Sequence, residues 1–297
     1  MKGQKILVTG APGLVGSALT LELCKNNEVY GLARFSDAGM RTKLEQAGVS
    51  IIQKDVHRES LDDLPDDFDY IFSQVVMVDS CDENPGEAFD VNAYFVGRLM
   101  DHCRKASGVV LASSGSVYAP GPDPLDEDGT IGPVNAYGIS KLGGELLGIF
   151  LSQQWQIPTC ILRYFFPYSP DGGRPTQWAR QIANSEEILV NRAYDPVFSP
   201  LYMSDCIRYT IESARHCSVP ATVINVGGAE TVTQAEILAI LSESLDVEPK
   251  FRETDEVPRF WNADVGLMLR LFGPPEVTLK EGLTRVAGAL RTRDRQS

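Results

Sequence analysis

Residues 6–16 read I-L-V-T-G-A-P-G-L-V-G, and this stretch decides the fold of the chain. A short apolar run typical of a buried strand leads directly into three glycines spaced G-x-x-G-x-x-G, where a helix is expected to begin. Such a turn lets backbone N–H groups approach a pyrophosphate, and the helix N-terminus favours negative charge. The context of strand, glycines and helix therefore predicts a dinucleotide site. The residues expected to contact the cofactor there are Gly10, Gly13, Leu14, Val15 and Gly16.

Strand-like and helix-like segments alternate after this stretch. The expected strands are residues 6–8, 29–33, 49–52, 70–76, 109–113, 159–164 and 222–226. The expected helices are residues 14–25, 37–47, 87–106, 134–152, 204–216 and 233–245. Nearly continuous apolar strands separated by crossover helices are typical of an α/β protein with a doubly wound parallel sheet, covered on both faces.

A change in composition near residue 166 indicates a second region. The segment F-P-Y-S-P-D-G-G-R-P collects prolines and glycines there, and mixed segments follow it. We expect residues 1–165 to form a dinucleotide-binding Rossmann domain, with strand and helix returns near 200–227. Residues 166–297 are expected to form a smaller substrate-binding region, interleaved with the last strands of the sheet.

The bulk composition is that of a globular protein and argues against several partners. Of the 297 residues, 43% are hydrophobic and 23% are charged, and the net charge is −13. An acidic chain offers no basic face to nucleic acid or to an anionic membrane. The six cysteines form no C-x-x-C pair and only three histidines occur, so we expect no metal site. No signal-peptide pattern and no run of about 18 apolar residues is seen, so we expect a cytoplasmic protein.

The end of the second predicted strand bears on the choice of dinucleotide. An acidic residue at this place usually holds the ribose 2′-hydroxyl of NAD, whereas an arginine accommodates the 2′-phosphate of NADP. This chain has Arg34 here, so we predict NADP(H) in preference to NAD(H). An Arg34 that stacks on the adenine is the alternative. Asp55, after the third strand, is placed either to meet the adenine amino group or to cap a helix at 57–62.

Further motifs give the chain a resemblance to a known family. They are D-V at 55–56, D-V-N-A at 90–93, L-A-S-S-G-S-V-Y at 111–118, A-Y-G-I-S-K at 136–141, L-R-Y-F at 162–165, P-L-Y-M-S-D at 200–205 and I-N-V-G-G at 224–228. Together with the glycine turn, they make the chain resemble the extended short-chain dehydrogenase/reductases, the NAD-dependent epimerase/dehydratase group. The resemblance covers nearly the whole length and implies an NAD(P)-dependent enzyme that acts on a small, sugar-like molecule.

The resemblance implies three catalytic residues. Tyr137 takes the role of acid and base, Lys141 lowers its pKa and holds the nicotinamide ribose, and Ser114 bonds the reacting oxygen. The physics is consistent with these roles, because a tyrosine titrates near about 10 and must be brought about three units lower. One ammonium about 4 Å away supplies on the order of 4 kcal/mol at an effective dielectric of about 20.

Other positions are assigned to the cofactor with alternatives left open. Val56 and Val75, at the ends of the third and fourth strands, are expected to contact the dinucleotide. Asn92 matches a family asparagine near the active site, although a buried amide that bonds the main chain explains it equally well. Tyr164 and Phe165 are placed to border the nicotinamide, and core packing is their alternative.

The substrate side departs from the family pattern. Relatives that dehydrate or decarboxylate their substrates carry a glutamate where this chain has Ser116, and a hydroxyl cannot perform the proton transfers of a carboxylate. Phe166 and Phe198 replace an asparagine and an arginine that face the substrate's phosphates in relatives. We therefore hypothesise a substrate less dependent on a nucleotide diphosphate, with Arg174 or Arg192 as substitute clamps.

Three functions remain at this stage. The first is net transfer of hydride between NADP(H) and a secondary alcohol or ketone of a sugar-like substrate. The second is a nucleotide-sugar 4-epimerase that keeps NAD(H) bound, and the third is a sensor that binds NADP(H) without catalysis. By resemblance, a homodimer through the helices at 87–106 and 134–152 is expected.

Overall fold

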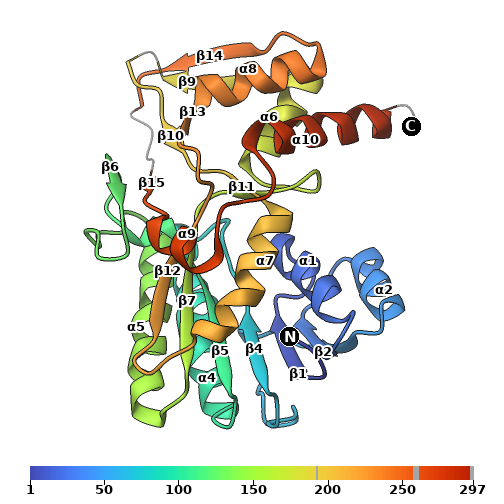
Figure 1. The fold of residues 1–297 in the computed structure, drawn as a ribbon, viewed down its shortest axis with the longest axis vertical. Helices are drawn as coiled ribbons and strands as arrows, with labels where there is room; N and C mark the ends of the chain where they lie inside the picture. The colour runs from blue at the N-terminus through green and yellow to red at the C-terminus, as the bar shows by residue number, and fades with distance from the viewer. Residues whose placement is uncertain (192, 257–260, 295–297) are drawn as a thin grey trace. The chain divides into compact units, whose positions relative to one another are not determined.

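The computed structural model describes residues 1–191, 193–256 and 261–294, which divide into two compact units (Figure 1). Unit 1 consists of Met1–Ala119, Thr130–Tyr164 and Ile207–Ile224, and unit 2 consists of Pro120–Gly129, Phe165–Cys206 and Asn225–Ser297. The sequence places residues 120–129 in the first domain. They belong to unit 2, because their strand pairs with a strand near residue 262.

A seven-stranded sheet with the order β12-β7-β5-β4-β1-β2-β3 lies at the centre of unit 1. Its strands are β1 (Lys5–Thr9), β2 (Glu28–Ala33), β3 (Ser50–Gln53), β4 (Tyr70–Ser73), β5 (Gly108–Ser114), β7 (Thr159–Tyr164) and β12 (Thr222–Val226). The pairs from β7 across to β3 are parallel. The predicted doubly wound α/β fold is confirmed, and β4 ends three residues earlier than the apolar run suggests.

The helices of unit 1 occupy the crossovers between these strands. They are α1 (Leu14–Leu23), α2 (Ala38–Gln46), α3 (Pro85–Phe89), α4 (Phe95–His102) and α5 (Ala136–Trp155), with α7 (Met203–Ser213) entering the unit at Ile207. Short helical turns are η1 (Asp90–Tyr94), η2 (Gly115–Val117) and η3 (Ala214–His216). The single helix expected at 87–106 is therefore interrupted by η1, a π-helical turn between α3 and α4.

Helix α5 carries two of the predicted catalytic residues, and its start and packing are well defined. Asn135 caps it, with its side-chain oxygen accepting a hydrogen bond from Gly138 N at 2.8 Å. Farther along, α5 lies directly against η1, because a Cβ on Gly144 would stand only 2.3 Å from Asn92 O. A small residue at this position therefore lets the two backbones approach closely and fixes the height of α5 beside the sheet.

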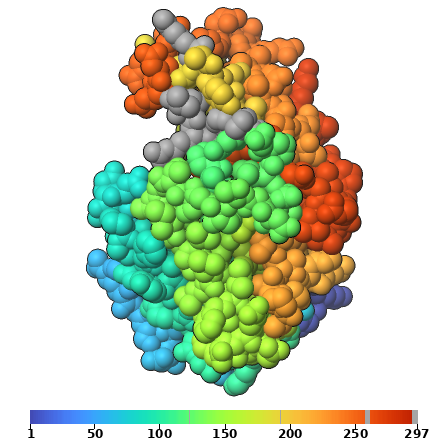
Figure 2. Space-filling view, turned by 90° about the vertical axis from the view of Figure 1, so that its left-hand side faces the viewer, coloured from blue at the N-terminus to red at the C-terminus, as the bar shows by residue number. Residues whose placement is uncertain are grey.

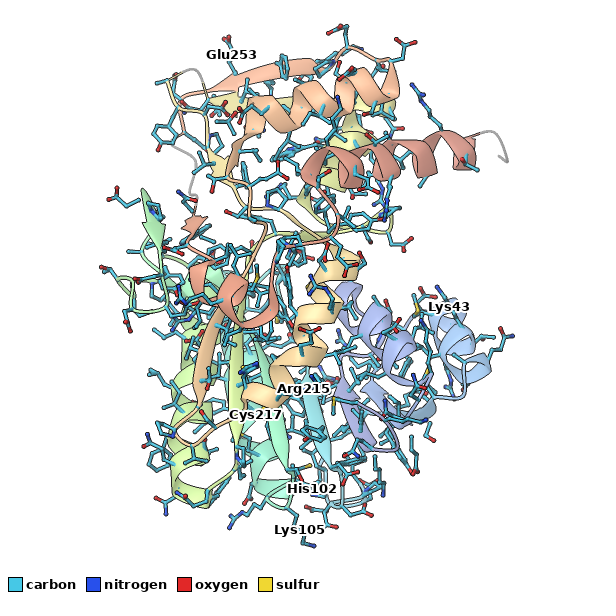
Figure 3. The ribbon with its side chains drawn as sticks, in the orientation of Figure 1. Lys43, His102, Lys105, Arg215, Cys217 and Glu253 are labelled. Carbon is cyan, nitrogen blue, oxygen red and sulfur yellow. The ribbon has the colours of Figure 1, made fainter. Side chains whose placement is uncertain are left out.

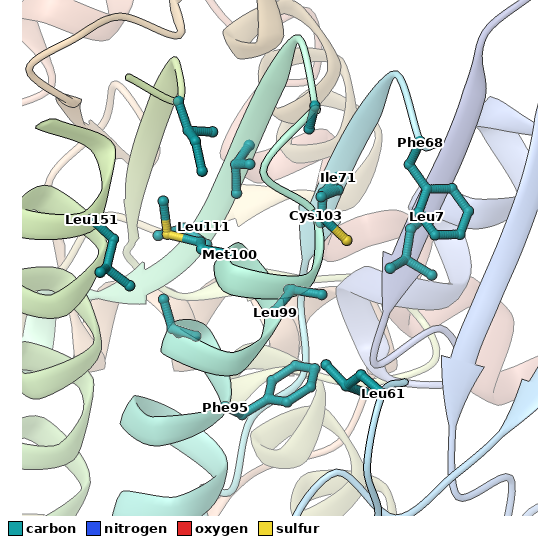
Figure 4. Packing of buried hydrophobic residues seen from close by; sticks show 14 of the residues in the cluster. Leu7, Leu61, Phe68, Ile71, Phe95, Leu99, Met100, Cys103, Leu111 and Leu151 are labelled. Atoms are coloured by element: carbon teal, nitrogen blue, oxygen red, sulfur yellow. The ribbon is translucent and has the colours of Figure 1, made fainter. Parts of the chain in front are cut away.

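The main hydrophobic core of unit 1 lies between the sheet and helices α4 and α5 (Figure 4). Leu7, Ile71 and Leu111 contribute from the strands, while Leu99 and Leu151 contribute from the helices, and all are at most 7% exposed. Burial of one such side chain contributes roughly 1.5–3 kcal/mol. This cluster holds β5 and α5, the two elements that carry the catalytic residues, in one rigid body.

Unit 2 is built from helices and small sheets. Its helices are α6 (Arg174–Ala183), α8 (Gln234–Leu245), α9 (Gly266–Phe272) and α10 (Leu279–Asp294). The strand pairs are β6 (Gly121–Leu125) with β15 (Trp261–Ala263), β8 (Pro167–Tyr168) with β11 (Leu201–Tyr202), β9 (Glu187–Asn191) with β14 (Lys250–Thr254), and β10 (Val197–Phe198) with β13 (Val232–Thr233). A separate core contains Trp178, Ile182, Leu241 and Leu283. The start of α8 is fixed by a capping box between Thr233 and Glu236.

Several polar and sulfur-bearing side chains of unit 1 have structural roles. Figure 3 labels Cys217 and His102. The thiol of Cys217 lies 3.6 Å from Val109 O, and burial raises its pKa to about 12. His102 Nε2 lies 3.1 Å from Leu64 O. Among the helices that the structure describes, none is long and apolar enough to cross a membrane.

Candidate active site

The candidate cofactor site lies at β1, where the order of the strands in the unit 1 sheet reverses. Strand β1 pairs with β2 on one side and with β4 on the other, so the crossovers that leave it diverge. In open α/β sheets, ligands bind in the crevice outside the carboxyl ends of such strands. A cavity of about 330 Å³ opens here. It is lined by Gly10, Pro12, Gly13, residues 33–37, residues 54–56, residues 74–77, Glu87 and Val91.

The glycine turn forms one wall of this cavity, and its glycines are sterically required. Gly10 has a φ of +68°, and a Cβ there would lie 2.6 Å from Val75 N. A Cβ on Gly16 would lie 2.1 Å from Gly10 O. Helix α1 begins after Gly13 with no side-chain cap and no acidic residue in its first turn, so the backbone N–H groups of Leu14 and Val15 are available to an anion. These residues fit a dinucleotide pyrophosphate.

Arg34 lies at the end of β2 in the same cavity. Its side chain is exposed, and within the described part of the chain its guanidinium has no hydrogen-bond or ion-pair partner. Two other charged groups of this cavity are engaged. Asp37 caps α2 by accepting from Gly39 N at 2.9 Å, and Lys54 forms an ion pair with Asp63 at 2.8 Å. Arg34 is therefore the cation of this wall that is available to a ligand.

Asp55 lines the cavity but caps no helix. The segment 57–62 forms turns, so the helix expected there is wrong. The Asp55 carboxylate accepts a hydrogen bond from His57 N at 3.1 Å, as a helix N-cap does, but only the turn closed by Glu59 N and Asp55 O at 2.9 Å follows it. Val56 and Val75 also line the cavity, and Val75 N donates to Thr9 Oγ1 at 3.3 Å.

Asn92 is buried in η1 and has three hydrogen bonds. Its Oδ1 accepts from Met77 N, and its Nδ2 donates to Met77 O and to Ser140 Oγ, each at 2.9 Å. The side chain is 1% exposed. These contacts match the alternative considered for Asn92, a buried amide that hydrogen-bonds the main chain. They connect the loop after β4 to the first turns of α5.

Ser114, Tyr137 and Lys141 come together as expected. Ser114 ends β5, and its hydroxyl accepts from Ser116 N at 3.1 Å. The Ser114 side chain also faces the Tyr137 phenol closely enough to lower the pKa of Tyr137 in part. Lys141 lies one turn of α5 farther on and is 4% exposed, and its Nζ donates to Ala112 O at 2.6 Å. The predicted pair on α5 is thus held against the end of β5, with all three functional groups within unit 1.

Burial dominates the titration of both residues on α5. It raises the pKa of Tyr137 above its usual value, and the hydrogen bond from Ser114 offsets only part of this. Burial also lowers the pKa of Lys141 to about 8, against the opposing effect of the Glu145 carboxylate. Burial therefore works against a lowered tyrosine pKa, and the lowering assigned to Lys141 stays a prediction.

A buried ion pair behind the site was not predicted. Arg163 on β7 donates from Nη2 to Glu145 Oε2 at 2.8 Å and from Nη1 to the Tyr118 hydroxyl at 2.6 Å. Ser113 Oγ donates to the same carboxylate. Arg163 and Glu145 are 5% and 3% exposed. The signal in the sequence was an arginine inside the apolar strand T-C-I-L-R-Y, which demands a buried anionic partner.

The residues predicted for the substrate side are distributed over both units. Ser116 lies in unit 1, whereas Phe166, Phe198 and Arg174 lie in unit 2 and Arg192 is outside the described residues. The Phe166 and Phe198 rings meet edge to face at 4.9 Å. The Arg174 guanidinium lies 6.0 Å from the ring centre of Trp178, a further partner of this aromatic group.

Tyr164 and Phe165 have packing partners of their own. The Tyr164 hydroxyl lies 2.8 Å from Thr210 Oγ1 within unit 1. Phe165 is 2% exposed, and its backbone N donates to Val226 O at 2.8 Å within unit 2. Core packing accounts for Phe165, and contact of either residue with a nicotinamide stays a prediction.

A glycine-lined crevice at the switch point of a doubly wound sheet, together with a Ser–Tyr–Lys group, defines an enzyme of the short-chain dehydrogenase/reductase type that uses NAD(P). The model of the NAD dependent epimerase/dehydratase family matches residues 6–227, and the chain belongs to this family. The resemblance seen in the sequence is thereby confirmed. Hydride transfer at an alcohol or ketone of a sugar-like substrate is the chemistry of this enzyme type.

Individual relatives and solved structures extend the match over nearly the whole chain. The UDP-glucose epimerase YtcB of Bacillus subtilis, described as uncharacterized, is 26% identical over 95% of this chain and 96% of its own. UDP-glucuronate 4-epimerase 1 of Arabidopsis thaliana is 27% identical over 95% of this chain and 76% of its own. The crystal structure of UDP-glucuronic acid 4-epimerase from Bacillus cereus, in complex with UDP-glucuronic acid and NAD, is 25% identical, with a TM-score of 0.88 over 97% of this chain and 99% of that chain.

Proposed function

We propose that the protein is a sugar 4-epimerase that retains its dinucleotide through the reaction. The observation that carries this proposal is that Ser114 at the end of β5 acts on the pKa of Tyr137, with the buried ammonium of Lys141 on the same helix donating to Ala112 O of β5. It is supported by the UDP-sugar 4-epimerases among the relatives and by the neighbour solved with NAD. The epimerase was the second of the functions considered from the sequence alone.

In the proposed mechanism, this chain's own residues move one proton and hold one oxygen. Tyr137 takes the proton of the substrate hydroxyl while Ser114 keeps that oxygen in place. After the sugar has rotated to present its other face, Tyr137 returns the proton. The dinucleotide, which the glycine turn would hold, would supply the hydride acceptor and donor for the sugar carbon. Ser116 cannot supply the proton transfers of a carboxylate, which favours epimerisation over dehydration or decarboxylation.

Net oxidation or reduction with an exchanging NADP(H) is the second candidate. Arg34 favours it, because an exposed guanidinium in the cofactor cavity suits a 2′-phosphate. The neighbours solved with NAD support the other cofactor. Preference for NADP(H) over NAD(H) is therefore a separate proposal that rests on Arg34 alone.

The aromatic group of unit 2 supports a proposal about the substrate. Phe198 contacts Phe166 at 4.9 Å and Trp178 at 5.3 Å, and it is 8% exposed. A diphosphate is stabilised by arginine forks and amides, and an aromatic cluster supplies neither. We therefore keep the proposal that the substrate depends less on a nucleotide diphosphate than those of the relatives. Of the two proposed clamps, Arg174 is the one within the described residues, and it is exposed beside Trp178.

The test of the proposed function is to denature the purified protein, identify the nucleotide it releases, and then assay UDP-glucose, UDP-glucuronate and the corresponding free sugars. We expect near-stoichiometric NAD(H) and interconversion of 4-epimers without added cofactor. A protein that emerges empty and turns over only with added NADPH would replace the epimerase by the oxidoreductase. Micromolar binding of a UDP-sugar would refute the weaker dependence on a diphosphate.

Arg34→Ala separates the two roles considered for this side chain. If the guanidinium binds a 2′-phosphate, the Kd for NADPH should rise by about tenfold or more, since a hydrogen bond to a charged group contributes about 1.5–3 kcal/mol. The Kd for NADH should then change little. Titrations that follow nicotinamide fluorescence measure both constants. Equal losses for the two cofactors would show that Arg34 stacks on the adenine instead. Lys43→Ala, an exposed cation on α2 that does not line the cavity (Figure 3), is the control.

The expected homodimer is also a proposal, and it is supported by one face of α5. Ile139, Leu146 and Phe150 are 44%, 59% and 58% exposed there. Their spacing of seven and four residues places them along one side of the helix. Figure 2 shows α5, in yellow-green, at the surface of the molecule. Sedimentation equilibrium distinguishes a dimer from the 32.6 kDa monomer.

A further inference from the structure

Gln74 is a buried amide whose side-chain nitrogen has no hydrogen-bond partner in the part of the chain that the structure describes. It follows the last residue of β4, where its backbone N donates to Thr9 O at 3.1 Å, and its side chain is 7% exposed. The side-chain Nε2 is buried and has no hydrogen-bond partner among residues 1–191, 193–256 and 261–294. An amide donor that is buried without a partner destabilises the unliganded protein, so its presence calls for a partner that arrives later.

The position of Gln74 indicates what that partner is. Gln74 lines the cofactor cavity together with Gly10 and Gly13. It is also one of the nearest neighbours of the glycine turn, since a Cβ on Gly10 would lie 2.7 Å from Gln74 C. This is the wall at which a Rossmann fold brings its backbone up to the dinucleotide's phosphates. The two residues that follow, Val75 and Val76, are apolar, so Gln74 is the polar side chain among these three residues.

Gln53 shows how an amide in the same region behaves when it has a structural role. It ends β3, next to β2 in the sheet, and both ends of its side chain are bonded. Its Oε1 accepts from Arg41 Nη1 at 2.8 Å, and its Nε2 donates to Arg34 O at 3.1 Å. Gln74 has the same chemistry without such a partner for its Nε2, which makes a role in holding the fold together the weaker explanation.

We infer that Gln74 binds the cofactor, with its side-chain Nε2 donating a hydrogen bond to an oxygen of the dinucleotide's pyrophosphate or of an adjoining ribose. The inference rests on the dinucleotide site of the proposed function and adds to it a specific side-chain donor at the end of β4. It also predicts an inverse relation between the stability of the unliganded protein and its affinity for the cofactor.

The test is Gln74→Leu, measured without activity on wild-type and variant protein from which any retained nucleotide has first been removed. Removing the unpartnered donor should raise the melting temperature of the unliganded protein by about 2–4 °C. The same change should raise the Kd for NADH, and for ADP-ribose, which lacks the nicotinamide, by about tenfold, the value of one hydrogen bond. Gln74→Met, which is unbranched, tests the same loss if leucine packs poorly. A Kd unchanged in both variants overturns the inference.

Gln234→Leu is the matched control. Gln234 is also 7% exposed, but its Nε2 donates to Leu189 O at 3.0 Å within unit 2. Its replacement should lower the melting temperature and leave the Kd for NADH unchanged. If the wild-type protein bound neither NADH nor ADP-ribose, the cofactor site itself would be refuted along with this inference, whereas wild-type binding that Gln74→Leu does not weaken refutes the inference alone.

Discussion

Tyr137→Phe is expected to reduce kcat by about 10³-fold, which is within the range of a lost general acid and base. The phenylalanine removes one hydroxyl and keeps the ring, so the contacts of α5 with its neighbours persist. Ser114 still accepts its hydrogen bond from Ser116 N at 3.1 Å, and Lys141 still donates to Ala112 O at 2.6 Å. The cofactor Kd and the unfolding midpoint should therefore stay close to the wild-type values. Steady-state kinetics, a cofactor titration and urea unfolding measure the three quantities.

Tyr30→Phe is the matched control for this prediction. The Tyr30 hydroxyl bonds Glu28 Oε1 at 2.7 Å on the surface of β2, so the same chemical deletion is made at an exposed site. We expect its kcat to be unchanged. Substantial turnover by Tyr137→Phe would refute the acid and base role, while a large loss of cofactor affinity would show that Tyr137 acts mainly in binding.

The features that sequence reasoning predicted well have local causes. The glycine turn needs Gly16 because a Cβ there would lie 2.1 Å from Gly10 O in the same turn. Tyr137 and Lys141 share a face because four residues make about one helical turn. Strands β1, β2, β5 and β7 follow from short apolar runs with turn signals on either side. In each case, the information lies within about ten residues of the feature.

The features that sequence reasoning missed depend on partners far away in the chain. The π-helical turn η1 is set by the close approach of α5, since Gly144 lies against Asn92 O. Strands β8, β10 and β11 have two residues each and exist only through their pairing. Residues 120–129 join unit 2 through their pairing with β15, which lies far along the chain. No periodicity within these segments encodes such contacts.

Glu145→Gln is expected to destabilise unit 1 by about 3–5 kcal/mol, the cost of removing one partner of a buried ion pair. The Glu145 carboxylate holds the pKa of Arg163 above its ordinary value, and the neutral amide of glutamine would remove that effect. Arg163 would still keep its charge, because a guanidinium is far too basic to lose its proton. It would also keep its hydrogen bond to the Tyr118 hydroxyl at 2.6 Å, so the loss isolates the missing anion. Urea unfolding followed by circular dichroism gives the change in free energy.

Two further variants decide whether the missing charge or the altered packing causes that loss. Glu281→Gln removes the anion of an exposed pair, in which Arg285 Nη2 lies 2.6 Å from Glu281 Oε1, and should change stability by at most about 1 kcal/mol. The double variant Glu145→Leu with Arg163→Met replaces both buried charges by apolar groups and should be more stable than Glu145→Gln alone, since no charge is left unpaired. A double variant that is as unstable as Glu145→Gln would show that shape and hydrogen bonding, rather than charge balance, hold α5 against β7 behind the catalytic residues.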